Sequence, residues 1–138
     1  KVTVRNKGKR EFFDSAIRFL AQELKINNHN YKLEMTSRRG LRKDMGAAGV
    51  AGMLGPRDFT VILDCDLAFD DMIRVLCHEM VHIKQMARGQ YKSRYKSGRF
   101  TNFWMGKACR KSYYKQPWEL DAWAKEDLLS LKLYSVMV

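Results

Sequence analysis

The sequence predicts a single α+β domain over residues 1–138, and three observations favour this fold class. Apolar residues recur at helical spacing over residues 11–24 and 70–88, while other stretches show the alternation typical of strands. A last helix is expected from Pro117 to about Leu133, because proline suits the first turn of a helix. The composition is that of an ordinary globular protein, and 138 residues suit one core better than two. Helices and strands follow one another without repeats or a linker, which indicates α+β.

The strands of the expected sheet differ in clarity. Alternating apolar residues indicate short strands at residues 2–4 and 31–35, and the clearest strand covers residues 59–63. The small, apolar segment 46–54 is either an edge strand with close backbone neighbours or a flexible flap. The polar segment 38–43 is expected to be a loop. A short mixed or antiparallel sheet would then pack against the first two helices.

The charge is strongly positive and unevenly distributed. The chain has 26 Lys and Arg against 15 Asp and Glu, and no acidic residue lies between Glu79 and Glu119. Aromatic residues alternate with the cations there, and residues 91–112 are expected to be irregular with a hairpin at 104–107. A polyanion is a natural partner for such a surface, although an acidic peptide or plain solvation would also explain it. The candidate nucleic-acid contacts are Lys92, Arg94, Lys96, Arg99, Trp104, Lys107, Arg110 and Lys111.

Three cysteines, Cys65, Cys77 and Cys109, form no CxxC pair and are odd in number. A disulfide framework or a cysteine metal site is therefore not expected, and small, partly buried thiols are. The first residues carry no apolar signal-peptide core, and no apolar run has the length of a membrane span. A cytoplasmic location is expected, with no membrane partner and with the oligomeric state open.

The motif that carries chemistry is His78-Glu79-Met80-Val81-His82, an HExxH sequence in the second predicted helix. Residues four apart stand above one another on a helix face, so two imidazoles can share one Zn²⁺. The intervening Glu79 can then accept a proton from a water that the metal activates, as in metallopeptidases. The pattern predicts His78 and His82 as metal ligands and Glu79 as the catalytic base.

A catalytic zinc usually has a third protein ligand. The candidates are Glu119 and Asp121 on the last helix, and His29 in an Asn-rich turn. An acid near a helix N-terminus is also favoured by the macrodipole alone, and Asp121 could instead orient a ligand histidine. Tyr113 and Tyr114 are candidates for oxyanion stabilisation, with simple packing as the alternative.

The stretch 59–131 resembles small metallopeptidases of the gluzincin type. The similarity is to SprT-like and ImmA/IrrE-like proteins, including short phage-encoded ones, and it is carried by HExxH and by Glu119-Leu120-Asp121-Ala122 on the following helix. The resemblance implies a small zincin-like domain in which Glu119 is the third zinc ligand. The chain lacks the third histidine that SprT proteins commonly use and the zinc-ribbon cysteines of longer ones.

The resemblance also implies the activity. The expected function is zinc-dependent peptide hydrolysis of a protein or peptide substrate, with proteins bound to DNA as one substrate class and a host cytoplasm as the location if the chain is phage-encoded. The alternative is a nucleic-acid-binding or regulatory protein with a structural or vestigial zinc site. An intact Glu79 favours the enzyme, because a structural site needs no base.

Overall fold

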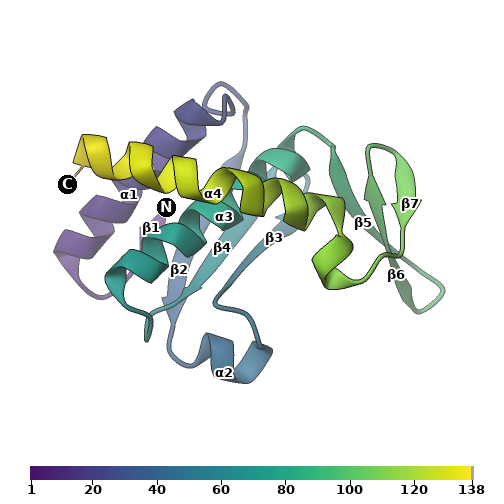
Figure 1. Cartoon of the computed structure of the whole chain (residues 1–138), viewed down its shortest axis with the longest axis horizontal. Coiled ribbons are helices and arrows are strands. Elements are labelled where there is room, and N and C mark those ends of the chain that lie inside the picture. The colour runs from purple at the N-terminus through teal and green to yellow at the C-terminus, as the bar shows by residue number, and fades with distance from the viewer. Residues whose placement is uncertain (138) are drawn as a thin grey trace.

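The computed structural model describes residues 1–137, and its α+β architecture confirms the predicted fold class. The helices are α1 (Lys7–Glu23), α2 (Leu41–Met45), α3 (Phe69–Ala87) and α4 (Pro117–Met137), with a 3₁₀ turn at Tyr113–Lys115. The strands are β1 (Val2–Thr3), β2 (Lys32–Arg38), β3 (Gly49–Gly55), β4 (Asp58–Asp64), β5 (Tyr91–Lys96), β6 (Arg99–Trp104) and β7 (Lys107–Cys109). They form two separate sheets (Figure 1).

The first sheet is mixed and has the strand order β1-β2-β4-β3. Strands β1, β2 and β4 run parallel, and β3 pairs antiparallel with β4. Segment 46–54, for which a strand and a flap were both open, is therefore largely a strand, and that strand lies at the edge of the sheet. An edge strand keeps one row of backbone N–H and C=O groups free of strand partners.

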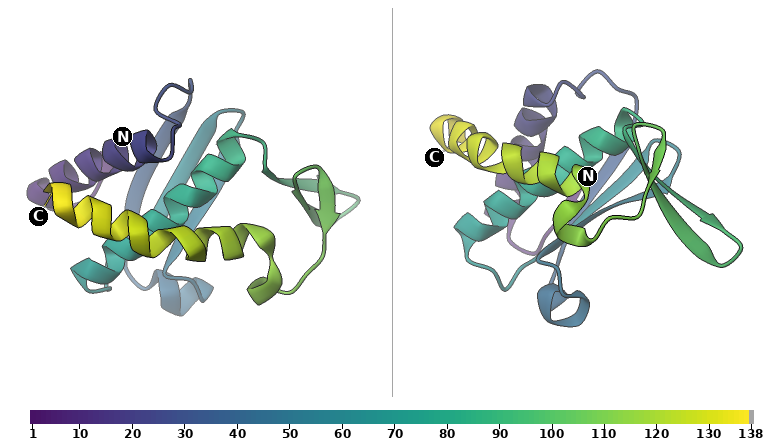
Figure 2. Two further views of the ribbon diagram at one scale, coloured as in Figure 1. Left: turned by 45° about the horizontal axis from the view of Figure 1, so that its top comes forward. Right: turned by 45° about the vertical axis from the view of Figure 1, so that its right-hand side comes forward.

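Helices α1, α3 and α4 lie over one face of this sheet (Figure 2). Strand β4 shows why, because Phe59, Val61 and Leu63 are buried while the residues between them are only half-buried. In a strand, alternate residues face the same side, so these three side chains meet the helices. They share one core with buried residues of α1, α3 and α4, which include Phe13, Leu20, Ile73, Leu76, Met80, Ala122 and Leu133.

Two helices differ in extent from the sequence expectation, and a third was not expected. Helix α1 begins at Lys7, because the Asn6 side chain accepts a hydrogen bond from the Lys9 N–H and so caps the helix. Helix α4 continues to Met137, beyond Leu133. The expected loop at 38–43 contains the start of α2, whose Arg42 N–H donates to the carboxylate of Asp64.

The expectation of irregular structure for residues 91–112 was wrong for residues 91–109 and holds only for residues 110–112. Strands β5, β6 and β7 form an antiparallel sheet that projects from the body, which we call the arm (residues 91–109; Figures 1 and 2). The predicted hairpin at 104–107 is confirmed, and a second one turns at Ser97-Gly98. Both turns have two central residues with positive φ, the conformation of a two-residue type I′ hairpin.

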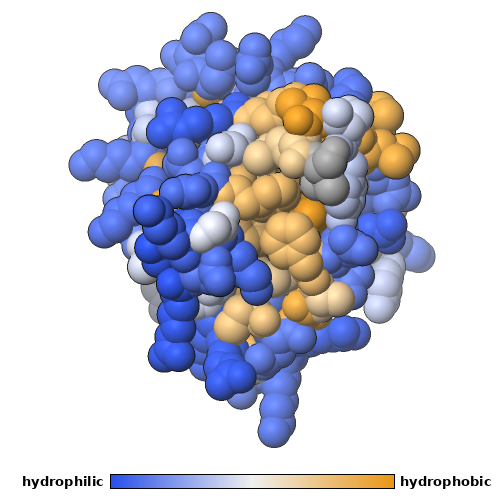
Figure 3. Space-filling model, turned by 90° about the vertical axis from the view of Figure 1, so that its left-hand side faces the viewer, coloured by the Kyte–Doolittle hydropathy of each residue, from blue (hydrophilic) through white to orange (hydrophobic). Residues whose placement is uncertain are grey.

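The opposite end of the molecule has a different surface. The ends of α1 and α4 lie there, and Figure 3 shows a band of apolar residues on this face, flanked by hydrophilic ones. Phe69, at the start of α3, contacts Phe12 with ring centroids 5.0 Å apart.

Among residues 1–137, no helix combines the length and the apolar character that a bilayer crossing requires.

Candidate metal centre

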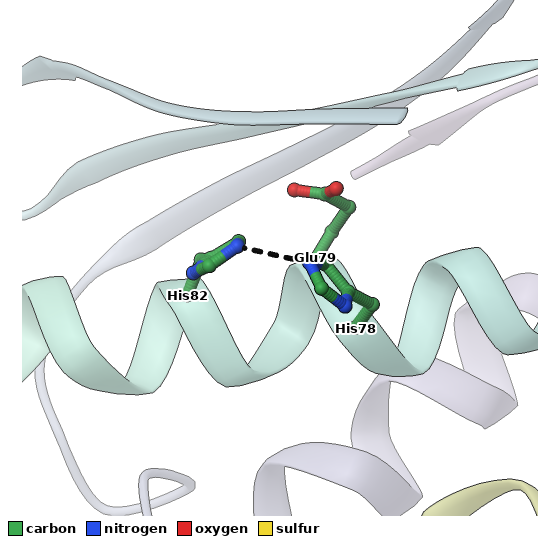
Figure 4. Close-up of side chains that lie close together, drawn as sticks. All are labelled: His78, Glu79 and His82. Atoms are coloured by element: carbon green, nitrogen blue, oxygen red, sulfur yellow. Dashed lines mark hydrogen bonds between the residues drawn. The ribbon is translucent and has the colours of Figure 1, made fainter. Parts of the chain in front are cut away.

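Helix α3 supplies the three central side chains. His78, Glu79 and His82 are each at most 9% exposed, and their potential ligand atoms lie within 4.8 Å of one another. The imidazoles stand one helical turn apart, and the Glu79 carboxylate reaches towards the strands (Figure 4). Buried polar side chains need partners, so this group marks α3 as more than a core helix. The group could hold a metal ion.

Helix α4 brings a carboxylate to the same point. The Glu119 Oε1 atom lies 2.8 Å from His78 Nε2 and 3.1 Å from His82 Nε2, and the two Nε2 atoms are 3.2 Å apart. Three potential ligand atoms from two helices thus form a small triangle. Of the three candidates for the third ligand, Glu119 is the one that the structure places on both imidazoles.

This triangle fits the size of a tetrahedral metal site. Bonds of about 2.05 Å at tetrahedral angles separate two ligand atoms by about 3.3 Å. The three separations here are slightly shorter, so a modest outward movement of the side chains would admit an ion. Two neutral imidazoles and a carboxylate are also the donor set that a catalytic zinc uses, with a further position left for water or substrate.

A second layer of contacts fixes both histidines. His78 Nδ1 lies 3.2 Å from Glu126 Oε2, and His82 Nδ1 lies 2.9 Å from Gln85 Oε1. The Gln85 amide in turn donates to Asp121 Oδ2, at 2.9 Å, and to the Trp118 carbonyl oxygen. With Nδ1 occupied in this way, each ring presents Nε2 to the centre. Asp121 therefore acts on His82 through Gln85 rather than directly.

Sequence reasoning missed Glu126 and Gln85. Their signal was spacing, since Glu126 follows Glu119 by two helical turns and Gln85 follows His82 by three residues. Both positions face the same side as the ligand candidate on their helix.

The pKa values of the two carboxylates in the centre, Glu79 and Glu119, are shifted in opposite directions. Burial raises the pKa of Glu79, and the nearby histidines only partly oppose that shift. Burial also acts on Glu119, but the hydrogen bonds from His78 and His82 overcome it and lower its pKa to about 2. Burial would lower the pKa of His82, yet Glu119 and Glu79 raise it. Glu119 is thus held as an anion, whereas Glu79 has an increased affinity for a proton.

Strand β3 passes directly beside Glu79. A Cβ added to Gly49 would overlap the Val75 side chain and would lie 3.1 Å from Glu79 Cγ. Only glycine lets the strand and α3 approach so closely. The edge strand of the main sheet therefore borders the centre.

The tyrosine pair lies next to Trp123, which is near His78. Trp123 is 6.2 Å from the His78 ring, and Tyr113 and Tyr114 are 5.5 Å and 6.1 Å from Trp123, between ring centroids. Burial raises the pKa of Tyr113, and the carboxylates of Glu119 and Glu79 raise it further. Both tyrosines are more than half exposed, and with Trp123 they form a cluster of aromatic rings near the centre. A role in oxyanion binding stays a prediction.

The other candidates lie elsewhere. Within residues 1–137, no hydrogen bond or ligand grouping joins His29 to His78 or His82. The candidate nucleic-acid contacts lie on the arm or directly after it. Trp104 is half-buried and pairs in register with Tyr91, which contacts Trp118 at 4.7 Å between centroids.

Comparison of this chain with protein-family models, with curated proteins and with solved structures finds no match.

Proposed function

We propose that the protein is a zinc-dependent peptidase with a small zincin-like domain, in which His78, His82 and Glu119 hold the metal. The observation that carries the proposal is the convergence of two Nε2 atoms and Glu119 Oε1 within 3.2 Å of one another, with Glu79 beside them. Zinc, when bound, acts as a Lewis acid that polarises a carbonyl and makes water more acidic.

Glu79 is suited to the role of general base. It is the carboxylate of the centre that makes no hydrogen bond to either imidazole, and burial raises its pKa. A base whose pKa moves towards neutrality accepts a proton from water more readily and can then deliver it to the leaving amine. A closed structural site, by contrast, uses four protein ligands and has no need of such a residue.

The free edge of strand β3 offers a place for an extended substrate to bind. A peptide in extended conformation can add to a free sheet edge through main-chain hydrogen bonds. Strand β3 offers that edge, and Gly49 brings it against Glu79. We propose that the substrate pairs with β3, so that the scissile carbonyl lies between β3 and the two histidines.

The test uses purified protein, loaded with zinc, on a proteome-derived peptide library read by mass spectrometry. Wild-type protein should cleave library peptides, a chelator should stop cleavage, and added Zn²⁺ should restore it. The Glu79→Gln variant should bind zinc at the same stoichiometry and cleave about 10²- to 10⁴-fold more slowly, because an amide cannot accept the proton. Glu34→Gln, the same change on the exposed β2 position, is the matched control.

Two results would overturn the proposal. One is cleavage by Glu79→Gln at the wild-type rate. The other is a zinc-loaded wild-type protein that cleaves no peptide in the library.

A further inference from the structure

The cations of the arm are uncompensated. The arm has five Lys and Arg residues and no acidic residue, and among residues 1–137 none of the five forms a salt bridge. Lys96 and Arg99 are even direct partners across the β5–β6 hairpin. Like charges placed opposite each other destabilise a strand pair. The arm therefore carries a charge arrangement that disfavours its own folding and favours an anionic ligand.

The strand register gives the arm two chemically different faces. Partners across the strands share a face, so Lys92, Arg94 and Lys96 lie with Phe103, Thr101 and Arg99 on one side. The other side carries an aromatic row in which Tyr95 pairs with Phe100 and Tyr91 pairs with Trp104. At its base this aromatic face packs on α4, through the Tyr91–Trp118 contact. Towards the tip it is open to solvent.

A pocket of about 460 Å³ lies on the open part of the aromatic face. Phe100, Asn102 and Cys109 line it from β6 and β7, and Arg110 and Lys111 line it from the segment that follows. Lys96 and Arg99 also line it from the hairpin tip, although the register assigns them to the basic face, and the lining contains no carboxylate. Its volume lies in the range of small-molecule sites, about 300–1,000 Å³. The pocket thus combines four cations with one flat ring.

The exposure of the aromatic rings favours a single-stranded nucleic acid over an acidic peptide or a duplex as the anionic ligand. Phe100 is 75% exposed and Tyr95 is 65% exposed, with their ring centroids 4.9 Å apart. An acidic peptide would use the cations but would leave these rings without a specific partner. A nucleic acid strand uses both, because phosphates pair with Lys and Arg while unpaired bases stack on aromatic rings. A duplex keeps its bases stacked inside and offers no base face to Phe100.

We propose that the arm binds single-stranded nucleic acid, with a base stacked on Phe100 and neighbouring phosphates held by Arg110 and Lys111. This inference goes beyond the proposed hydrolytic function and does not depend on it. The arm sits next to the metal centre through Tyr91 and Trp118, so a bound strand would lie close to the proposed peptidase site.

The first experiment is a titration of the full chain into a fluorescently labelled oligothymidylate, followed by anisotropy at several salt concentrations. Binding should be measurable at tens of micromolar protein or below, within about 10⁻⁴–10⁻⁶ M at physiological salt. The double variant Arg110→Ala with Lys111→Ala should bind more weakly, and its salt slope should be lower by about 1.4, since a single strand contributes about 0.7 per phosphate. Lys7→Ala with Lys43→Ala removes the same charge from exposed positions on α1 and α2 and should leave the slope unchanged.

The second experiment isolates the stacking contact. Phe100→Ala should weaken oligothymidylate binding about 5- to 100-fold without changing the salt slope. Leu128→Ala, which removes an exposed apolar side chain from α4, is its control and should have no effect. A chelator and Glu79→Gln should also have no effect on binding, so this inference and the peptidase proposal fail independently.

Three outcomes would overturn the inference. The first is no binding of oligothymidylate at about 100 μM protein near physiological salt. The second is equal affinity for polyglutamate, which would assign the arm to acidic peptides. The third is a duplex that binds as tightly as the single strand together with a Phe100→Ala variant that binds normally.

Discussion

In the centre between α3 and α4, both histidines contact a carboxylate, whereas no Lys or Arg of the arm forms a salt bridge among residues 1–137. His78 lies between Glu119 and Glu126, and His82 lies between Glu119 and Gln85. In the arm, Lys96 faces Arg99 across the hairpin. The difference separates two kinds of binding site. The side chains of the buried centre are held in place by one another before a ligand binds, whereas the unpaired charges of the exposed arm find their counter-charges only in a ligand.

The largest effect is expected from breaking the centre. His78→Ala removes one of the three converging atoms and should abolish stoichiometric zinc binding, because two protein ligands no longer fix the ion. Metal analysis after dialysis measures this directly. His29→Ala is the control, and loss of zinc in that variant instead would show that the ligand set is wrong.

The second layer of the centre should matter less but measurably. Glu126→Gln keeps the shape of the side chain and removes its charge from His78 Nδ1, and outer contacts of this kind contribute about 10- to 100-fold in metal affinity. Competition with a chelating dye gives the affinity. Asp127→Asn, one position on and exposed, should bind zinc normally. Equal affinity in Glu126→Gln would mean that the Glu126 contact does not orient the ring.

A third change tests the close approach of β3 to α3. Gly49→Ala places a methyl group against Val75 and Glu79 and should lower the free energy of unfolding by about 1–3 kcal/mol, as overpacking does. Gly52→Ala is a matched control on the same strand, because the nearest atom to its added Cβ is Thr60 Cγ2 at an ordinary 3.6 Å. Urea unfolding of both variants measures the difference. Equal free energies of unfolding in the two variants would contradict the close packing of Gly49 against Val75 and Glu79.

The smallest effect should have the opposite sign and should come from the arm. Lys96→Glu converts the like-charge pair with Arg99 into an opposite-charge pair and should stabilise the hairpin by about 0.2–1 kcal/mol. Lys43→Glu, on α2, is the control. Hydrogen exchange of the β5 and β6 amides reads the local stability, and faster exchange in Lys96→Glu would show that the two cations do not repel.

The sequence predicted the centre better than it predicted the arm, for a physical reason. His78, Glu79 and His82 are close in the chain, so helical spacing alone brings them together. Glu119 comes from another helix, and only the resemblance to metallopeptidases favoured it over the other two candidates, His29 and Asp121. Glu126 and Gln85 escaped notice because an acid or amide on a helix usually faces water.

The arm was taken for irregular structure because its strands lack an apolar face of the usual kind. In β5 the alternation is between aromatic and basic residues rather than between apolar and polar ones, so the period of two is masked. The Ser97-Gly98 pair was a usable turn signal. Helix α2 is too short to show any period at all.

The register of the two sheets also indicates that their strands pair at different rates during folding. Pairing in the main sheet joins Val2 to Met35 and Lys32 to Asp58, so the chain must close long loops before these strands meet. In the arm, Lys96 meets Arg99 across a two-residue turn, and the remaining pairs follow by zipping outwards. Local hairpins form in about 1–10 μs, whereas distant pairing slows folding. We therefore expect the arm to complete its strand pairing before the main sheet does.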